Sequence, residues 1–290
     1  MNTTSFTSIN LKTLSLYLLV LILAHGADPE LAKNQALAAS GDAQAQLYVG
    51  VAYMTGDGIP LDYVKARQVL SLAAAQGNAK ARNDLGVLYK NGMGVKPDPV
   101  EAVKWFRLAA DQGLDGAQFN LAAMYLDGTG VAKDIPTAVG WYQKAAEQGL
   151  RKAQLKLGTL YFLGDAGVAK DPVQAAKWLT SAAQQGDPTA QNMLGSLYET
   201  GSGVPQDPAQ AFAWFNKAAQ QGDPKAEGNV GRLYYSGIGV KQDLLKACQW
   251  IILASEQGDV VATHFLSAFT DDQLEQGRKL ADQFKSRQSR

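Results

Sequence analysis

Cysteine and histidine, two residue types that often perform covalent or metal chemistry, are scarce in this 290-residue sequence. Cys248 is the only cysteine, and His25 and His264 are the only histidines. A zinc site or a Cys/His catalytic dyad therefore lacks its minimum set of partners. Cys248 also occupies a position that related segments fill with apolar residues such as Val103 and Phe212, so we predict a buried structural residue and not a reactive thiol.

Two short motifs bear on enzymatic function. Gly-x-Gly recurs along the chain, as in Gly92-Met93-Gly94, but it follows predicted helices and not the strand that precedes a phosphate-binding loop. The Ser-x-x-Lys motif of penicillin-recognising enzymes occurs nowhere. We expect no catalytic residue, no bound metal and no small-molecule cofactor.

The charge balance argues against nucleic acid as a partner. Lys+Arg and Asp+Glu both number 27, so the chain has no net charge with which to attract a polyanion. The hydrophobic content of 46% is enough to build a folded core.

The first 27 residues differ from the rest of the chain. Lys12 precedes an apolar run over residues 14–24, and the small residues Gly26 and Ala27 follow it. A run of this length is shorter than the ~20 residues that span a bilayer as a helix. We predict a signal peptide over 1–27, cleaved near Gly26/Ala27, and hence a periplasmic or secreted protein without a stable membrane span after cleavage. An uncleaved anchor is the alternative.

A fixed internal period dominates the remainder. Seven glycines follow one another at intervals of 36 or 37 residues, a period typical of helical solenoids. They are Gly41, Gly77, Gly113, Gly149, Gly186, Gly222 and Gly258.

Each period predicts two helices. In the second repeat, residues at helical spacing form one face of each segment: Ala81, Leu85, Leu88 and Tyr89 on the first, Ala102, Trp105 and Ala109 on the second. Asp-Pro pairs such as Asp98-Pro99 predict helix starts, and Gly92 predicts a helix end.

Two aromatic columns run through the repeats, and we predict that both stabilise the contacts from one repeat to the next. All the tryptophans form one column: Trp105, Trp141, Trp178, Trp214 and Trp250. The other column contains Tyr53, Tyr89, Tyr125, Tyr161, Tyr198 and Tyr234. A third column holds small residues, such as Gly86 and Gly158, which would let neighbouring helices approach closely.

The sequence thus divides into several parts after the signal peptide. A capping helix over 28–40 precedes six repeats at about 41–76, 77–112, 113–148, 149–185, 186–221 and 222–257, which together span 41–258. Capping helices and a basic tail follow over 259–290.

These motifs resemble the Sel1-like repeat, a relative of the tetratricopeptide repeat. The pattern is Ala-x-x-x-Leu-Gly-x-x-Tyr-x-x-Gly-x-Gly-Val, then Asp-x-x-x-Ala-x-x-Trp and Ala-Ala-x-Gln-Gly, and it covers Ala43 to Asp259. The resemblance implies an all-α fold, a right-handed superhelical α-solenoid of antiparallel helix pairs, and an adaptor role in protein complexes, often in bacterial envelopes. Some secreted members are described as β-lactamase-like, but those carry paired cysteines in every repeat. One repeat here departs in length, with an extra residue in Gly164-Asp165-Ala166-Gly167.

Partner recognition must depend on the variable positions, because the recurring columns are occupied by packing. One stripe at i, i+4 and i+7 of the first helices is apolar in repeats one, three and four and largely polar in the others. By analogy with tetratricopeptide domains, whose first helices line a concave surface, we predict that the partner-binding residues are Phe119, Leu126, Leu155, Phe162 and Tyr235. The alternative is that these side chains pack against the adjacent second helix.

The predicted function is a non-catalytic scaffold that binds another protein or peptide in the bacterial cell envelope. One alternative is a cell-wall or β-lactam hydrolase, and another is a secreted effector that binds a host protein.

Overall fold

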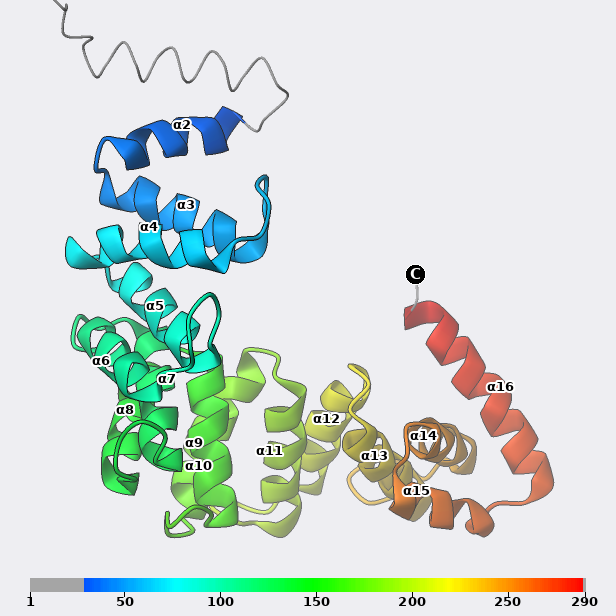
Figure 1. Ribbon diagram of the computed structural model, residues 1–290. Coiled ribbons are helices and arrows are strands. Elements are labelled where there is room, and N and C mark those ends of the chain that lie inside the picture. The colour runs from blue at the N-terminus through cyan, green and yellow to red at the C-terminus, as the bar shows by residue number, and fades with distance from the viewer. Residues whose placement is uncertain (1–28, 289–290) are drawn as a thin grey trace, which may run out of the picture. The chain divides into compact units, whose positions relative to one another are not determined.

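The computed structural model describes residues 29–288, and every regular element in this range is helical (Figure 1). The predicted signal peptide lies outside the described residues. No helix in the described part of the chain is long and apolar enough to cross a membrane.

Each repeat contributes a first and a second helix. The first helices are α3 (Ala43–Thr55), α5 (Ala79–Asn91), α7 (Asp115–Asp127), α9 (Arg151–Leu163), α11 (Pro188–Thr200) and α13 (Pro224–Ser236). The second helices are α4 (Tyr63–Ala75), α6 (Pro99–Ala110), α8 (Ile135–Glu147), α10 (Pro172–Gln184), α12 (Pro208–Ala219) and α14 (Leu244–Glu256). Helix α2 (Pro29–Ala39) precedes them, and α15 (Val260–Phe265), the 3-10 helix η1 (Leu266–Ala268) and α16 (Asp271–Gln288) follow.

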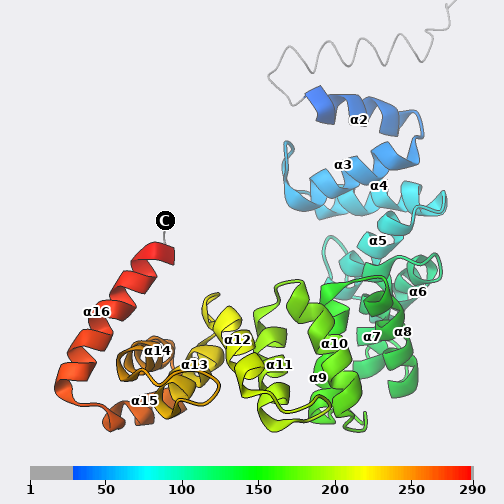
Figure 2. The ribbon, with the colours of Figure 1, turned by 180° about the vertical axis from the view of Figure 1, so that it is seen from behind.

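The chain divides into two compact units, Met1–Trp141 and Tyr142–Arg290. In the first unit α3 packs on α4 and α5 on α6, and α4 also contacts α5 of the next repeat. In the second unit the pairs are α9 with α10, α11 with α12 and α13 with α14 (Figures 1 and 2). Each unit is therefore a stack of helix pairs, as the period predicts.

Local interactions fix where the helices begin and end. Asp98 accepts a hydrogen bond from the backbone N–H of Glu101 at 2.9 Å, and Pro99 occupies the first turn of α6, where no amide donor is needed. At the other end of a helix, Gly92 adopts a left-handed φ of 68° and donates its N–H to the carbonyl of Leu88. The expected caps are thus confirmed.

The second glycine of the Gly-x-Gly loops lies against the preceding repeat. A Cβ atom at Gly203 would lie 2.1 Å from the carbonyl oxygen of Pro172, at the start of α10, and one at Gly94 would lie 2.5 Å from the carbonyl carbon of Tyr63, at the start of α4. Any side chain would collide with backbone, so this motif is a contact between repeats.

The core of each repeat is formed by the residue that follows the tryptophan column. Leu70, Phe106, Tyr142, Leu179, Phe215 and Ile251 are all at most 2% exposed. Five of them face a glycine of the first helix closely: a Cβ at Gly86 would lie 2.6 Å from the Phe106 ring, and one at Gly195 would lie 2.7 Å from Phe215. The small-residue column therefore lets the first helix approach the second helix of its own repeat.

The C-terminal elements cover the last repeat. Thr270 and Gln273 exchange side-chain and backbone hydrogen bonds in a capping box at the start of α16. Helix α16 packs on α14, where the Phe284 ring meets Trp250 edge-on at 4.9 Å and Gly277 lies against Cys248.

Candidate functional site

The predicted apolar stripe of the first unit is only partly open. Leu126 of α7 is 6% exposed and belongs to the core, whereas Phe119 is half-buried. Near the start of the chain, Val51 and Tyr48 of α3 are exposed and line a pocket of about 230 Å³ with Leu47. The first unit thus offers an apolar surface on α3, and it does not offer Leu126.

In the second unit, Leu155 and Phe162 lie together on α9. Both are half-buried and pack on the apolar cluster formed by α10 and α11. Phe162 also lines a small pocket of about 170 Å³ with Ser196 and Thr200 of α11. Phe162 therefore contacts both the core and a pocket that α11 helps to line.

Tyr235 lies in an aromatic cluster with residues of the C-terminal elements. Its ring packs edge-on against Phe265 at 5.1 Å and against Phe269 at 5.8 Å. This aromatic cluster joins α13 to the C-terminal elements, so Tyr235 is engaged within the chain.

The aromatic columns lie partly at the surface. Trp178 and Trp250 are buried, at 5% and 6% exposed, while Trp105, Trp141 and Trp214 are partly exposed. The tyrosine column is also half-buried, except for the buried Tyr125. The ammonium of Lys217 lies 4.0 Å from the centre of the Trp214 ring.

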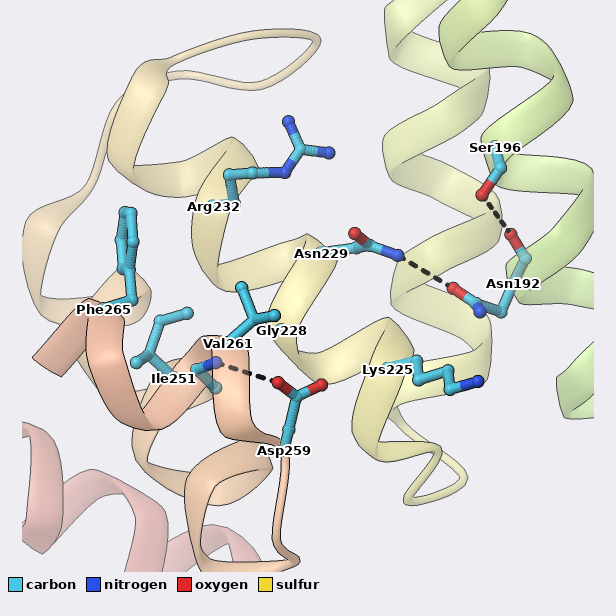
Figure 3. Close-up of a pocket in the computed structure, with 11 residues that line it drawn as sticks. Asn192, Ser196, Lys225, Gly228, Asn229, Arg232, Ile251, Asp259, Val261 and Phe265 are labelled. Carbon is cyan, nitrogen blue, oxygen red and sulfur yellow. Dashed lines mark hydrogen bonds between the residues drawn. The ribbon is translucent and has the colours of Figure 1, made fainter.

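A pocket with a volume of about 430 Å³ lies on the first helices α11 and α13 and on α15 (Figure 3). We call it the α11/α13/α15 groove. Its lining residues are Asn192, Ser196, Lys225, Gly228, Asn229, Arg232, Ile251, Asp259, Val261, Ala262 and Phe265.

Side chains from different repeats meet in this groove. Asn229 donates its Nδ2–H to Oδ1 of Asn192 at 3.0 Å, and Arg232 forms an ion pair of 2.6 Å with Glu199. Figure 3 shows Lys225, Asn229 and Arg232 along α13, with Asn229 directed at α11. This groove was not predicted from the sequence, although the polar stripe positions at Asn192, Glu199 and Arg232 were a signal for it.

A column of polar residues, most of them buried, was also not predicted from the sequence. In five repeats a first-helix side chain donates to the backbone carbonyl eight residues earlier, as Gln191 does to Ala183 at 3.1 Å. The corresponding bonds start from Gln46, Arg82, Gln118 and Gln154. A glutamine at the end of the second helix then donates to several of these side chains, as Gln221 does to Gln191 at 2.8 Å. The column ties each repeat to the one before it.

The last repeat places an acid in this column. Glu227 is 1% exposed and accepts a hydrogen bond of 2.8 Å from Gln257. Burial raises its pKa from 4.5 to about 7, the bond from Gln257 opposes this, and the charges of Asp223 and Glu256 add to the increase. A protonated Glu227 can donate a hydrogen bond as glutamine does in four of the other repeats.

The reactive residue types lie apart from one another. Cys248 is fully buried, and burial raises the pKa of its thiol to about 11. His264 is exposed, and its Nδ1 lies 2.7 Å from the carbonyl oxygen of Val260. Within residues 29–288, no three His, Cys, Asp or Glu side chains are grouped so that they could hold a metal ion.

Comparison with known proteins identifies the repeat. The family model for the Sel1 repeat matches at 43–78, 79–114, 116–150, 151–187, 188–223 and 224–259. The structure is similar to that of a Sel1 repeat protein from Oxalobacter formigenes, with 36% identity, a TM-score of 0.72, and coverage of 89% of this chain and 76% of that one. A protective antigen of uropathogenic Escherichia coli with an SLR fold is 30% identical, with coverage of 88% and 71% and a TM-score of 0.39. A comparison with proteins of curated function found no match.

Proposed function

Because the chain belongs to the Sel1 repeat family, we propose that it is a non-catalytic scaffold that binds another protein on the surface of its first helices. Proteins with this repeat generally act as scaffolds for protein–protein interaction. The observation that carries the proposal is the α11/α13/α15 groove, which the packing of the repeats leaves open on two first helices. The core columns are used for packing, so recognition falls to these variable side chains.

The first-helix surface has two parts that suit a protein partner. Tyr48 and Val51 form an exposed apolar area on α3 in the first unit. The groove in the second unit combines amide and charged groups with apolar side chains. Such a mixture of apolar contacts and oriented polar groups is typical of protein interfaces.

Site-specific photo-crosslinking in cells of the native host tests the proposal. A photoreactive phenylalanine analogue replaces Tyr48 or Ser196 on first helices, and Val100 or Val173, which are exposed on second helices, in the matched controls. We expect adducts with one partner protein from the first-helix positions and none from the controls. Equal labelling from both sets, or labelling from the second helices alone, would contradict the proposal.

We also propose that the protein acts outside the cytoplasm. The support is the N-terminal sequence, where Lys12 is followed by an apolar run and then by Gly26 and Ala27. The mass of the protein isolated from its host should correspond to a chain that begins near Ala27. A mass that includes residues 1–26 would refute cleavage, and detection only in the cytoplasm would refute export.

A further inference from the structure

Two side chains that line the α11/α13/α15 groove, Asn192 and Asn229, offer hydrogen-bonding groups that the fold leaves unused. The bond between Asn229 and Asn192 uses one donor and one acceptor. Within the described residues, neither the Asn192 Nδ2 nor the Asn229 Oδ1 has another protein partner. A free donor and a free acceptor on neighbouring side chains match the C=O and N–H of an extended peptide backbone.

The groove contains a cationic group, Lys225, that no carboxylate pairs within residues 29–288. Arg232 is neutralised by Glu199 at 2.6 Å. Asp259 accepts the backbone N–H of Ala262 at 2.8 Å, which holds its charged carboxylate at the start of α15. Lys225 is exposed and has no ion pair within residues 29–288. A carboxylate on the ligand would complement this ammonium group.

The α15 side of the groove is apolar and open. Val261 is 78% exposed and the adjacent Val260 is 67% exposed, although both lie on a helix that packs against α14. Phe265 is half-buried and shows part of its ring to the groove. Covering these side chains would remove apolar surface from water, which favours an apolar side chain on the ligand.

Gly228 leaves space for a ligand between the amide groups on α11 and α13 and the apolar side chains of α15. Gly228 lies on α13, and the nearest atom to a Cβ built there would be Asp259 Oδ2, at 3.7 Å. The volume of about 430 Å³ is of the size that holds a ligand of a few residues.

We propose that the α11/α13/α15 groove binds an extended peptide segment of a partner protein, with a carboxylate at Lys225 and an apolar side chain against Val261 and Phe265. The amide groups of Asn192 and Asn229 hold the peptide backbone. This inference rests on the proposed binding function and names the chemistry of the partner.

A synthetic peptide array probed with the full chain tests the inference. The array carries random heptapeptides, each with a free and with an amidated C-terminus, so that a side-chain carboxylate and a terminal carboxylate are distinguished. We expect the bound sequences to combine one carboxylate with a nearby Val, Leu, Ile or Phe. Lys225→Glu should lower their binding at least tenfold, while Lys241→Glu, the same charge change at an exposed residue outside the groove, should leave it unchanged.

A second pair of variants separates blocking of the groove from loss of the fold. Gly228→Met places a side chain in the groove and should abolish peptide binding, whereas Gly228→Ala should retain most of it, because a Cβ meets no close atom there. Peptides that the wild type and Lys225→Glu bind equally would refute this inference and leave the proposed scaffold function standing. A preference for basic peptides would also refute it, and an array without any bound sequence would count against both.

Discussion

The acid in the buried polar column makes the stability of the last repeat depend on pH. Glu227 has a pKa of about 7 in the folded chain, against 4.5 for an ordinary glutamate. The folded state therefore holds the proton more tightly than the unfolded state. The stability that this provides is fully present below pH 4.5, is lost as the pH rises towards 7, and stays lost above that value.

Replacing Glu227 by glutamine, the residue at this position in the preceding repeat, should remove this pH-dependent loss of stability. The pKa difference corresponds to at most about 3 kcal/mol, and screening by nearby solvent reduces it, so we expect Glu227→Gln to raise the free energy of unfolding by about 1–3 kcal/mol at pH 8. At pH 4.5 the protonated glutamate and glutamine should be nearly equivalent. Urea denaturation followed by circular dichroism at several pH values measures the difference between the two chains.

The reverse change in the preceding repeat is the matched control. Gln191 is also buried and donates to the carbonyl of Ala183. Gln191→Glu should therefore destabilise the chain at pH 8 and have little effect at pH 4.5. A difference between wild type and Glu227→Gln that stays constant from pH 4.5 to pH 8 would refute the assigned role of Glu227.

Three further predictions concern packing and reactivity. Phe106→Ala should cost about 3–5 kcal/mol of stability, more than Trp105→Ala, because Phe106 is fully buried and Trp105 is partly exposed; equal losses in thermal or urea denaturation would contradict the assigned core column. Gly195→Ala should destabilise by about 1–3 kcal/mol, since its Cβ would lie 2.7 Å from a buried ring. Gly140→Ala, which meets nothing within 4 Å, should stabilise by about 0.5–1 kcal/mol, and the opposite order of melting temperatures would be incompatible with this packing. Cys248 should react with an aromatic disulfide at pH 8 at least a hundredfold more slowly in the folded chain than in urea, because its pKa is raised to about 11 and it is buried; rapid labelling of the folded chain would show that the thiol is accessible.

The local features of the fold were predictable from the sequence. Helix ends depend on residues within a few positions of each other, so Asp98 and Gly92 predicted their caps correctly. The 36-residue period predicted the helix pairs, because the same short-range pattern is repeated six times.

The candidate site was predictable only in part. Neighbouring residues on a helix point about 100° apart, so two adjacent apolar residues, such as Trp105 and Phe106, do not reveal which of them faces the core. Leu126 and Phe162 occupy the same position of the stripe, yet one is buried and the other half-buried. The side chains around each residue determine how far it is buried, and the repeat period carries no information about these neighbours.

The sequence by itself determined the helices, their pairing and the family, because capping, glycine spacing and hydrophobic period act over short distances along the chain. Tertiary structure alone decided which side chains remain available to a partner. Contacts between segments far apart in the sequence engage Tyr235 with Phe269 and bring Asn192 to Asn229 beside an unpaired Lys225. Whether a side chain is buried or open depends on these contacts, and they form only when the repeats stack.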